Sequence, residues 1–132
     1  MLTLISRAED LAVAALPKDV DLHTGGEVRA AGERLCDDGC RYLVLDTSPV
    51  AYMDSIGITV LLDLRQRFDS AGGALLVAVP DEHLRWRLDI LGLDSVLFLT
   101  STPAEAVARA RRLRDSAHRP GRDTRQFRAD SA

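Results

Sequence analysis

The residues of this chain best suited to chemistry lie in one short segment, Tyr52-Met53-Asp54-Ser55-Ile56-Gly57. The apolar run ITVLLDL follows directly, so a carboxylate, a hydroxyl and a glycine stand where a loop is expected to turn into a helix. Ser55 has three possible roles there: it can cap the helix, attack a substrate or receive a group from another protein. Serine and aspartate are both preferred N-caps, so the bland interpretation is that Asp54 or Ser55 holds a free backbone amide.

An enzymatic role for Ser55 has little support in the surrounding residues. A nucleophile elbow requires Gly-x-Ser-x-Gly, and Met53 stands where the first glycine is needed. His23, His83 and His118 are candidate bases, but none lies in a catalytic signature, and the chain has no Gly-x-x-x-x-Gly-Lys phosphate loop. We therefore expect no enzymatic activity, and a hydrolytic or nucleotide-binding enzyme that uses Ser55 stays only as a third hypothesis.

No metal or cofactor is expected either. Cys36 and Cys40 are the only cysteines, which is too few for a closed structural zinc site, and no histidine lies near them in the sequence. Asp19 and Asp21 lie on an expected loop, and two carboxylates alone are a poor basis for a cation site. The two thiols are expected to be reduced and structural.

Length and composition favour one soluble domain. The chain has 132 residues, of which 46% are apolar and 28% charged. No apolar run approaches the roughly 20 residues that span a bilayer. The N-terminal MLTLISRAED lacks the basic start and long apolar stretch of a secretory signal. We expect a cytoplasmic protein without a membrane partner.

The net charge of −3 conceals an uneven distribution. Residues 1–108 contain 9 basic and 17 acidic side chains, a balance of −8, whereas residues 109–132 contain eight arginines and three aspartates, a balance of +5. An acidic body does not attract nucleic acid. The basic end lacks periodicity and apolar residues, so we expect a domain over residues 1–114 and a disordered tail over 115–132.

The hydrophobic periodicity predicts the element order β-β-α-β-α-β-α-β-α. Strands are expected at Leu2–Ser6, Leu11–Leu16, Tyr42–Leu45, Ala74–Val79 and Val96–Leu99. Four helices are expected between them: from Thr24 to Gly39, from the Asp54-Ser55 pair to Gly72, from Asp81 to Gly92, and from Thr102 onward. Thr24 with Glu27, and Thr102 with Glu105, form the pattern of a capping box. The fold class is α/β, with a mostly parallel sheet and an antiparallel N-terminal edge strand.

Four segments of the chain carry a resemblance to a known family. They are VDLHT, YLVLDTSPVAYMDSIGITVLLDLRQRF, GGALLVAVPDEHLRWRLDILGLDSVL and STPAEAV. In these segments the chain resembles a STAS domain and, more closely, the bacterial anti-sigma factor antagonists, also called anti-anti-sigma factors. The resemblance covers roughly residues 2–110 and implies a STAS-like single domain with the element order given above.

The resemblance also implies a role for Ser55. In that family, the serine after the aspartate of an Asp-Ser-[Ser/Thr]-Gly loop is phosphorylated by the cognate anti-sigma factor, which is itself a serine kinase. In this chain Asp54 precedes Ser55 and Gly57 closes the motif, whereas Ile56 replaces the second hydroxyl residue. The family's second pattern, Gly-Glu/Asp-apolar-Asp-x-x-Thr, matches at Asp19, Asp21 and Thr24, with Lys18 in place of the glycine.

The function that the resemblance implies is that of an anti-sigma factor antagonist. The unphosphorylated chain would bind the anti-sigma factor and release a sigma factor; phosphorylation of Ser55 would end binding, and a serine phosphatase would restore it. The expected partner-binding residues are Asp19, Asp21, Thr24, Tyr52, Met53, Asp54, Ile56 and Gly57. An alternative keeps the fold without the switch, as a scaffold subunit of a sensory or transport assembly.

Overall fold

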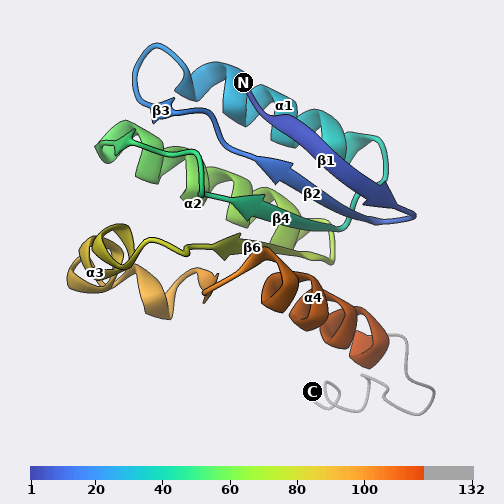
Figure 1. The fold of residues 1–132 in the computed structure, drawn as a ribbon. Helices are drawn as coiled ribbons and strands as arrows, with labels where there is room; N and C mark the ends of the chain where they lie inside the picture. The colour runs from blue at the N-terminus through green and yellow to red at the C-terminus, as the bar shows by residue number, and fades with distance from the viewer. Residues whose placement is uncertain (118–132) are drawn as a thin grey trace, which may run out of the picture.

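The structure is a computed structural model that describes residues 1–117 as one α/β unit built on a five-stranded sheet (Figure 1). The strands of this sheet are β1 (Thr3–Ala8), β2 (Leu11–Ala15), β4 (Tyr42–Asp46), β6 (Ala74–Ala78) and β7 (Phe98–Thr100). Their spatial order is β1-β2-β4-β6-β7, with β1 antiparallel to β2 and all other pairs parallel. The predicted fold class and the antiparallel edge strand are confirmed.

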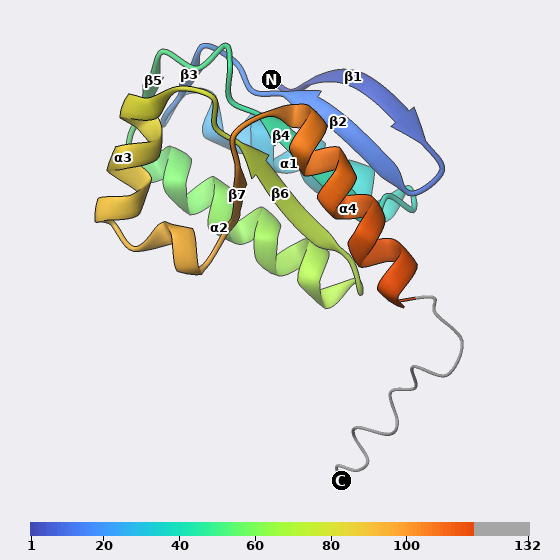
Figure 2. The same ribbon diagram turned by 60° about the horizontal axis from the view of Figure 1, so that its bottom comes forward.

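Helices cover both faces of the sheet. They are α1 (Gly25–Asp37), α2 (Ser55–Ser70), α3 (Glu82–Ile90) and α4 (Pro103–Ala117). Figure 2 shows α4 on one face and α1 and α2 on the other. Within residues 1–117, no helix combines the length and the apolar character needed to cross a membrane. After each of the first three helices the chain turns at a left-handed glycine, Gly39, Gly72 or Gly92, as predicted.

The core is divided between the two faces because alternate residues of the buried strands point in opposite directions. On the first face, Leu43 and Leu75 belong to the same buried cluster as Phe68 of α2. On the second face, Val44 and Leu76 pack in a cluster with Ala106 and Ala110 of α4. Such two-sided burial explains why β4 and β6 are continuous apolar runs in the sequence.

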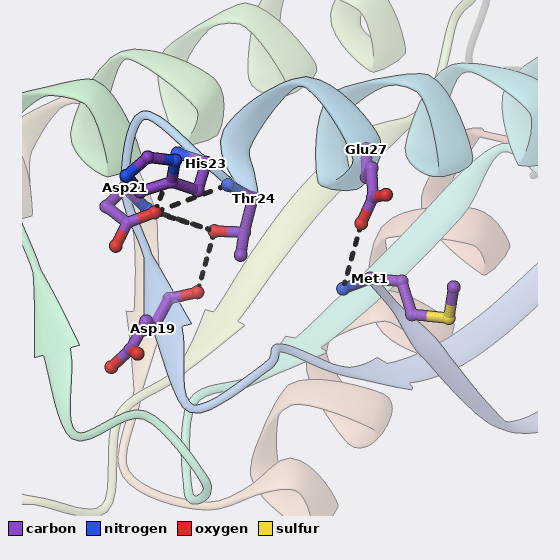
Figure 3. A network of polar contacts seen from close by, with 6 residues as sticks. All are labelled: Met1, Asp19, Asp21, His23, Thr24 and Glu27. Atoms are coloured by element: carbon purple, nitrogen blue, oxygen red, sulfur yellow. Dashed lines mark hydrogen bonds and ion pairs between the residues drawn. The ribbon is translucent and has the colours of Figure 1, made fainter.

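The capping box predicted at Thr24 does not form. Thr24 is the N-cap residue of α1, but its hydroxyl makes no capping hydrogen bond to the helix. It donates instead to the carbonyl oxygen of Asp19 at 2.7 Å. Glu27 forms an ion pair with the N-terminal amino group of Met1 at 3.9 Å, which is visible in Figure 3. The prediction failed because the loop before α1 folds back, and the Thr24 hydroxyl bonds to the backbone of that loop instead of to the helix.

The predicted start of α4 is largely correct. The Thr102 hydroxyl accepts from the backbone amide of Glu105 at 3.1 Å, and the Glu105 carboxylate accepts from the amide of Ser101, one residue before the expected partner, at 2.9 Å. The helix continues to Ala117, so residues 115–117, assigned to the tail, are helical. The rest of the expected tail, 118–132, lies outside the described residues.

Three short elements were not predicted. β3 (Asp19–Val20) and β5 (Tyr52–Met53) form a second, two-stranded parallel sheet, and a 3₁₀ turn occupies Leu93–Ser95. The last strand was expected at Val96–Leu99, but β7 begins at Phe98. Val96 instead caps the 3₁₀ turn, whose backbone also accepts the amide of Leu97.

Two buried groups predict how stability depends on pH. Burial raises the pKa of the Cys40 thiol above its ordinary value, and burial, with Asp10 nearby, does the same for the pKa of the Tyr42 hydroxyl. The unfolded chain therefore releases these protons at lower pH than the folded chain, so the free energy of unfolding should fall as pH rises past about 9. Urea unfolding at pH 7 and pH 10 measures this decline.

The variant Cys40→Ala with Tyr42→Phe removes both groups and should show a shallower decline over the same pH range. An equally steep decline in that variant would assign the alkaline sensitivity to other residues.

Candidate functional site

The small sheet β3–β5 brings together the two segments that the sequence singled out. Asp19 pairs with Tyr52, and Val20 pairs with Met53. The carbonyl oxygen of Lys18 accepts a hydrogen bond from the amide of Ala51 at 2.7 Å, which aligns the two chains at the start of the pairing. The Asp19–Thr24 loop therefore lies beside the loop that leads into α2 (Figure 2).

Gly57 permits this close approach. A Cβ atom at Gly57 would lie 2.5 Å from the carbonyl oxygen of Val20 and 2.7 Å from the Cγ of Met53. Atoms at these distances overlap, so any side chain at position 57 would push β3 and β5 away from the first turn of α2. Glycine is therefore required at the last position of the motif, because no other residue fits without moving β3 and β5.

Asp54, rather than Ser55, caps α2. One carboxylate oxygen of Asp54 accepts from the amide of Ile56 at 3.0 Å and from the amide of Gly57 at 3.2 Å. Ser55 is the first residue of the helix itself. Of the two N-cap candidates that the sequence offered, the structure uses Asp54, and the Ser55 hydroxyl does not cap the helix.

The Ser55 side chain is exposed and makes no hydrogen bond to any residue from 1 to 117. Its backbone carbonyl accepts from the Thr59 hydroxyl at 2.9 Å, as is usual inside a helix. The position beside the N-terminus of α2 is favourable for negative charge, because the first amides and the helix dipole are positive there. The hydroxyl is therefore accessible from solvent, and the helix N-terminus would stabilise the negative charge of a phosphate attached to it.

Asp21 and Thr24 build the neighbouring loop, as Figure 3 shows. One carboxylate oxygen of Asp21 accepts from the amides of His23 at 2.9 Å and Thr24 at 3.3 Å. The Thr24 hydroxyl accepts from the amide of Asp21 at 3.1 Å and donates to the carbonyl oxygen of Asp19. These bonds close a tight turn before α1, so two of the three matched family positions, Asp21 and Thr24, shape the loop through their side chains.

Asp19 differs from Asp21 because its side chain takes no part in this network. Only its carbonyl oxygen bonds to Thr24, and its exposed carboxylate points away from the turn (Figure 3). Among residues 1–117, no group of three or more histidine, cysteine or acidic side chains is arranged to hold a metal ion. Asp19 is therefore a negative charge presented to solvent beside the Ser55 loop.

Apolar side chains are exposed around the same site. Tyr52 is 52% exposed and Ile56 is 41% exposed, so both expected contact residues can touch a partner. Met53 is 1% exposed, and Gly57 is also buried, so the structure does not present them at the surface, and their expected role in partner binding stays a prediction. Because Tyr52 and Met53 are consecutive in a strand, they point to opposite sides, and only one can face outward.

Two further residues belong to the site, although the sequence did not single them out. Leu22 is 75% exposed at the tip of the Asp21–Thr24 turn. The only indication of this in the sequence is that an apolar residue stands between the polar residues Asp21 and His23. Arg87 of α3 donates to the carbonyl oxygen of Met53 at 2.8 Å and so fixes β5 from its other side. Arg87 gave no signal, because the contact joins residues that are 34 positions apart.

Comparison with known proteins assigns the fold to a family. The family model described as STAS domain matches residues 5–106, from β1 into the first turn of α4. The chain belongs to the STAS domain family. The expectation from the quoted segments is thereby confirmed at the level of the family.

Solved structures share this fold at low sequence identity. The anti-sigma factor antagonist SpoIIAA in its unphosphorylated form superposes with a TM-score of 0.70 at 20% identity, covering 84% of this chain and 96% of that one. An anti-sigma factor antagonist from Mycobacterium paratuberculosis gives 0.69 at 21% identity, covering 84% and 95%. A sulfate transporter family protein from Wolinella succinogenes gives 0.65 at 16% identity, covering 84% and 93%. Anti-sigma factor antagonists and a sulfate transporter family protein therefore share this architecture.

The packing at Gly57 predicts a specific sensitivity. Gly57→Ala should lower the free energy of unfolding by about 1–3 kcal/mol, because the added methyl overlaps the Val20 carbonyl. Gly26→Ala is the matched control, because a Cβ at Gly26 meets no atom within 4 Å, and it should be neutral or slightly stabilising in the first turn of α1. Chemical unfolding measures both, and equal stabilities for the two variants would contradict the close packing of β3, β5 and α2.

Proposed function

We propose that this STAS domain is an anti-sigma factor antagonist whose binding is switched by phosphorylation of Ser55. The observation that carries the proposal is the exposed Ser55 hydroxyl, which makes no hydrogen bond within residues 1–117 and stands at the N-terminus of a helix capped by another residue. A residue with no structural task can be modified without loss of the fold. The unmodified chain binds an anti-sigma factor with serine kinase activity and thereby releases a sigma factor.

The site supports a switch that acts by charge rather than by unfolding. Phosphorylation adds about 1.5 to 2 negative charges at neutral pH. The helix N-terminus favours that charge, while Asp54 continues to hold the amides of Ile56 and Gly57. Modification should therefore leave the backbone of the site in place and alter only what a partner meets.

The partner meets a surface of mixed character. Leu22, Tyr52 and Ile56 offer apolar contact, and Asp19 already contributes a negative charge. A partner that fits neutral Ser55 closely would have to bury a dianion after phosphorylation. An unpaired charge in an interface costs several kcal/mol, and about 4 kcal/mol weakens binding roughly a thousandfold. The same chain thus has a binding and a non-binding form, and separate kinase and phosphatase enzymes interconvert them.

The direct test is to incubate the protein with its cognate anti-sigma kinase and ATP and to map phosphate by mass spectrometry. We expect phosphate on Ser55 and none in the Ser55→Ala variant. Phosphate that maps only to other residues would reject the proposal.

The binding side is tested with two substitutions of the same residue. Ser55→Ala should bind the anti-sigma factor constitutively, because it retains the Asp54 cap and cannot be modified. Ser55→Asp should fold comparably and bind roughly tenfold more weakly or worse, a change of about 1.4 kcal/mol. Ser70→Asp adds the same charge at the other end of α2 and should bind like the unmodified protein. Equal affinities of Ser55→Ala and Ser55→Asp would show that charge at this position is not the switch.

The alternative function, a scaffold subunit without a switch, is favoured by Ile56 in place of a second hydroxyl and by the fold shared with the sulfate transporter family protein. In that case Ser55 stays unmodified in cells and the domain is recovered in a larger assembly. Native mass spectrometry of complexes purified from lysate separates the two functions, because the switch requires a small complex with a kinase.

A further inference from the structure

A second surface of the domain collects positive charge away from the Ser55 loop. A pocket of about 320 Å³ opens between α3, the end of β7 and α4. Its polar lining comes from Arg85, Thr100, Ser101, Glu105, Arg109 and Arg112. Three guanidinium groups thus face one carboxylate in a chain whose net charge is −3. None of these residues belongs to the β3–β5 site.

Among residues 1–117, the three arginines of the pocket belong to the arginines that form no ion pair, a group that also contains Arg7, Arg34, Arg41, Arg87 and Arg111. Ion pairs engage four arginines elsewhere: Arg29 with Asp63, Arg65 with Asp69, Arg67 with Asp37, and Arg114 with Asp10. In the part of the chain that the structure describes, Arg85, Arg109 and Arg112 form no ion pair with a carboxylate. Within residues 1–117, no carboxylate lies at ion-pair distance from these three arginines, and Glu105 is the one acidic side chain in the lining of the pocket.

Local contacts hold part of this pocket in place. The Arg109 guanidinium carbon lies 5.0 Å from the centre of the Phe98 ring, a cation–π distance. Arg85 donates to the Ser101 hydroxyl at 3.4 Å across the gap between α3 and the start of α4. The carboxylate of Glu105 accepts from the Ser101 amide at 2.9 Å, so one of its oxygens is already occupied. Arg85 and Arg109 are thus oriented before any ligand arrives.

We propose that this pocket, between Arg85 of α3 and Arg109 and Arg112 of α4, binds a small anion that carries linked phosphate groups. Planar guanidinium groups match phosphate oxygens in pairs, and charge-assisted bonds of this kind are the stronger class. Three arginines from two helices exceed what a single phosphate needs and suit a chain of two or three. The volume lies at the small end of the range for ligand pockets.

The test uses the full chain and inorganic pyrophosphate as the probe, with binding followed by calorimetry and by amide chemical shifts. We expect saturable binding that weakens as salt is added, with the largest shifts at Leu99, Thr100 and Ser101. Inorganic phosphate should bind more weakly than pyrophosphate, and tripolyphosphate at least as tightly. Shifts confined to residues outside the pocket, or no saturation, would reject the proposal.

Substitutions separate a built site from general charge. Arg85→Gln and Arg109→Gln should each weaken pyrophosphate binding about tenfold or more. Arg111→Gln is the matched control, because it removes the same charge from α4 at an exposed position that does not line the pocket, and it should leave affinity unchanged. An equal loss in all three variants would show unspecific attraction instead of a site.

The proposal is independent of the switch at Ser55. Ser55→Asp should bind pyrophosphate with unchanged affinity, because Ser55 does not line this pocket. If no phosphate is found on Ser55, the proposed anion site is unaffected. If pyrophosphate does not bind, the proposed switch at Ser55 is unaffected.

Discussion

The two-residue pairing of β3 with β5 is the constraint on which the site depends. It holds the Asp19–Thr24 loop against the loop before α2, and it is possible only because Gly57 leaves room for the Val20 carbonyl. Arg87 reaches across from α3 to bond the Met53 carbonyl, so β5 is held from both sides. A pairing this short gains little from its own hydrogen bonds, and its stability comes from burial of Val20 and Met53 beneath it.

The residues of the site have two different roles. The side chains of Asp54, Asp21 and Thr24 form hydrogen bonds to backbone groups and thereby fix the shape of the two loops. The side chains of Ser55 and Asp19 form no hydrogen bond to residues 1–117 and are exposed. A rigid frame with an unengaged hydroxyl is what a switch by covalent modification requires, since the modified group then changes the surface and not the fold.

Much of this architecture could be predicted from residue pattern. The continuous apolar runs of β4 and β6 and the glycines after α1, α2 and α3 report locally on burial and helix ends. β3 and β5 could not be predicted, because two residues are too few for a periodic signal and their partner is 33 positions away. For the same reason the burial of Met53 could not be predicted, because its inward direction follows only once Tyr52 is known to lie in a strand.

The central claim is that charge at Ser55 alters a surface and leaves the fold intact, and amide spectra of the phosphorylated and unphosphorylated chain test it most directly. The account predicts shift changes confined to the β3–β5 site and the first turn of α2, with a melting temperature that changes little. The core signals of β4 and β6 should stay in place. Shift changes spread through the sheet, or a large fall in melting temperature, would show that phosphorylation acts by unfolding and would contradict the account.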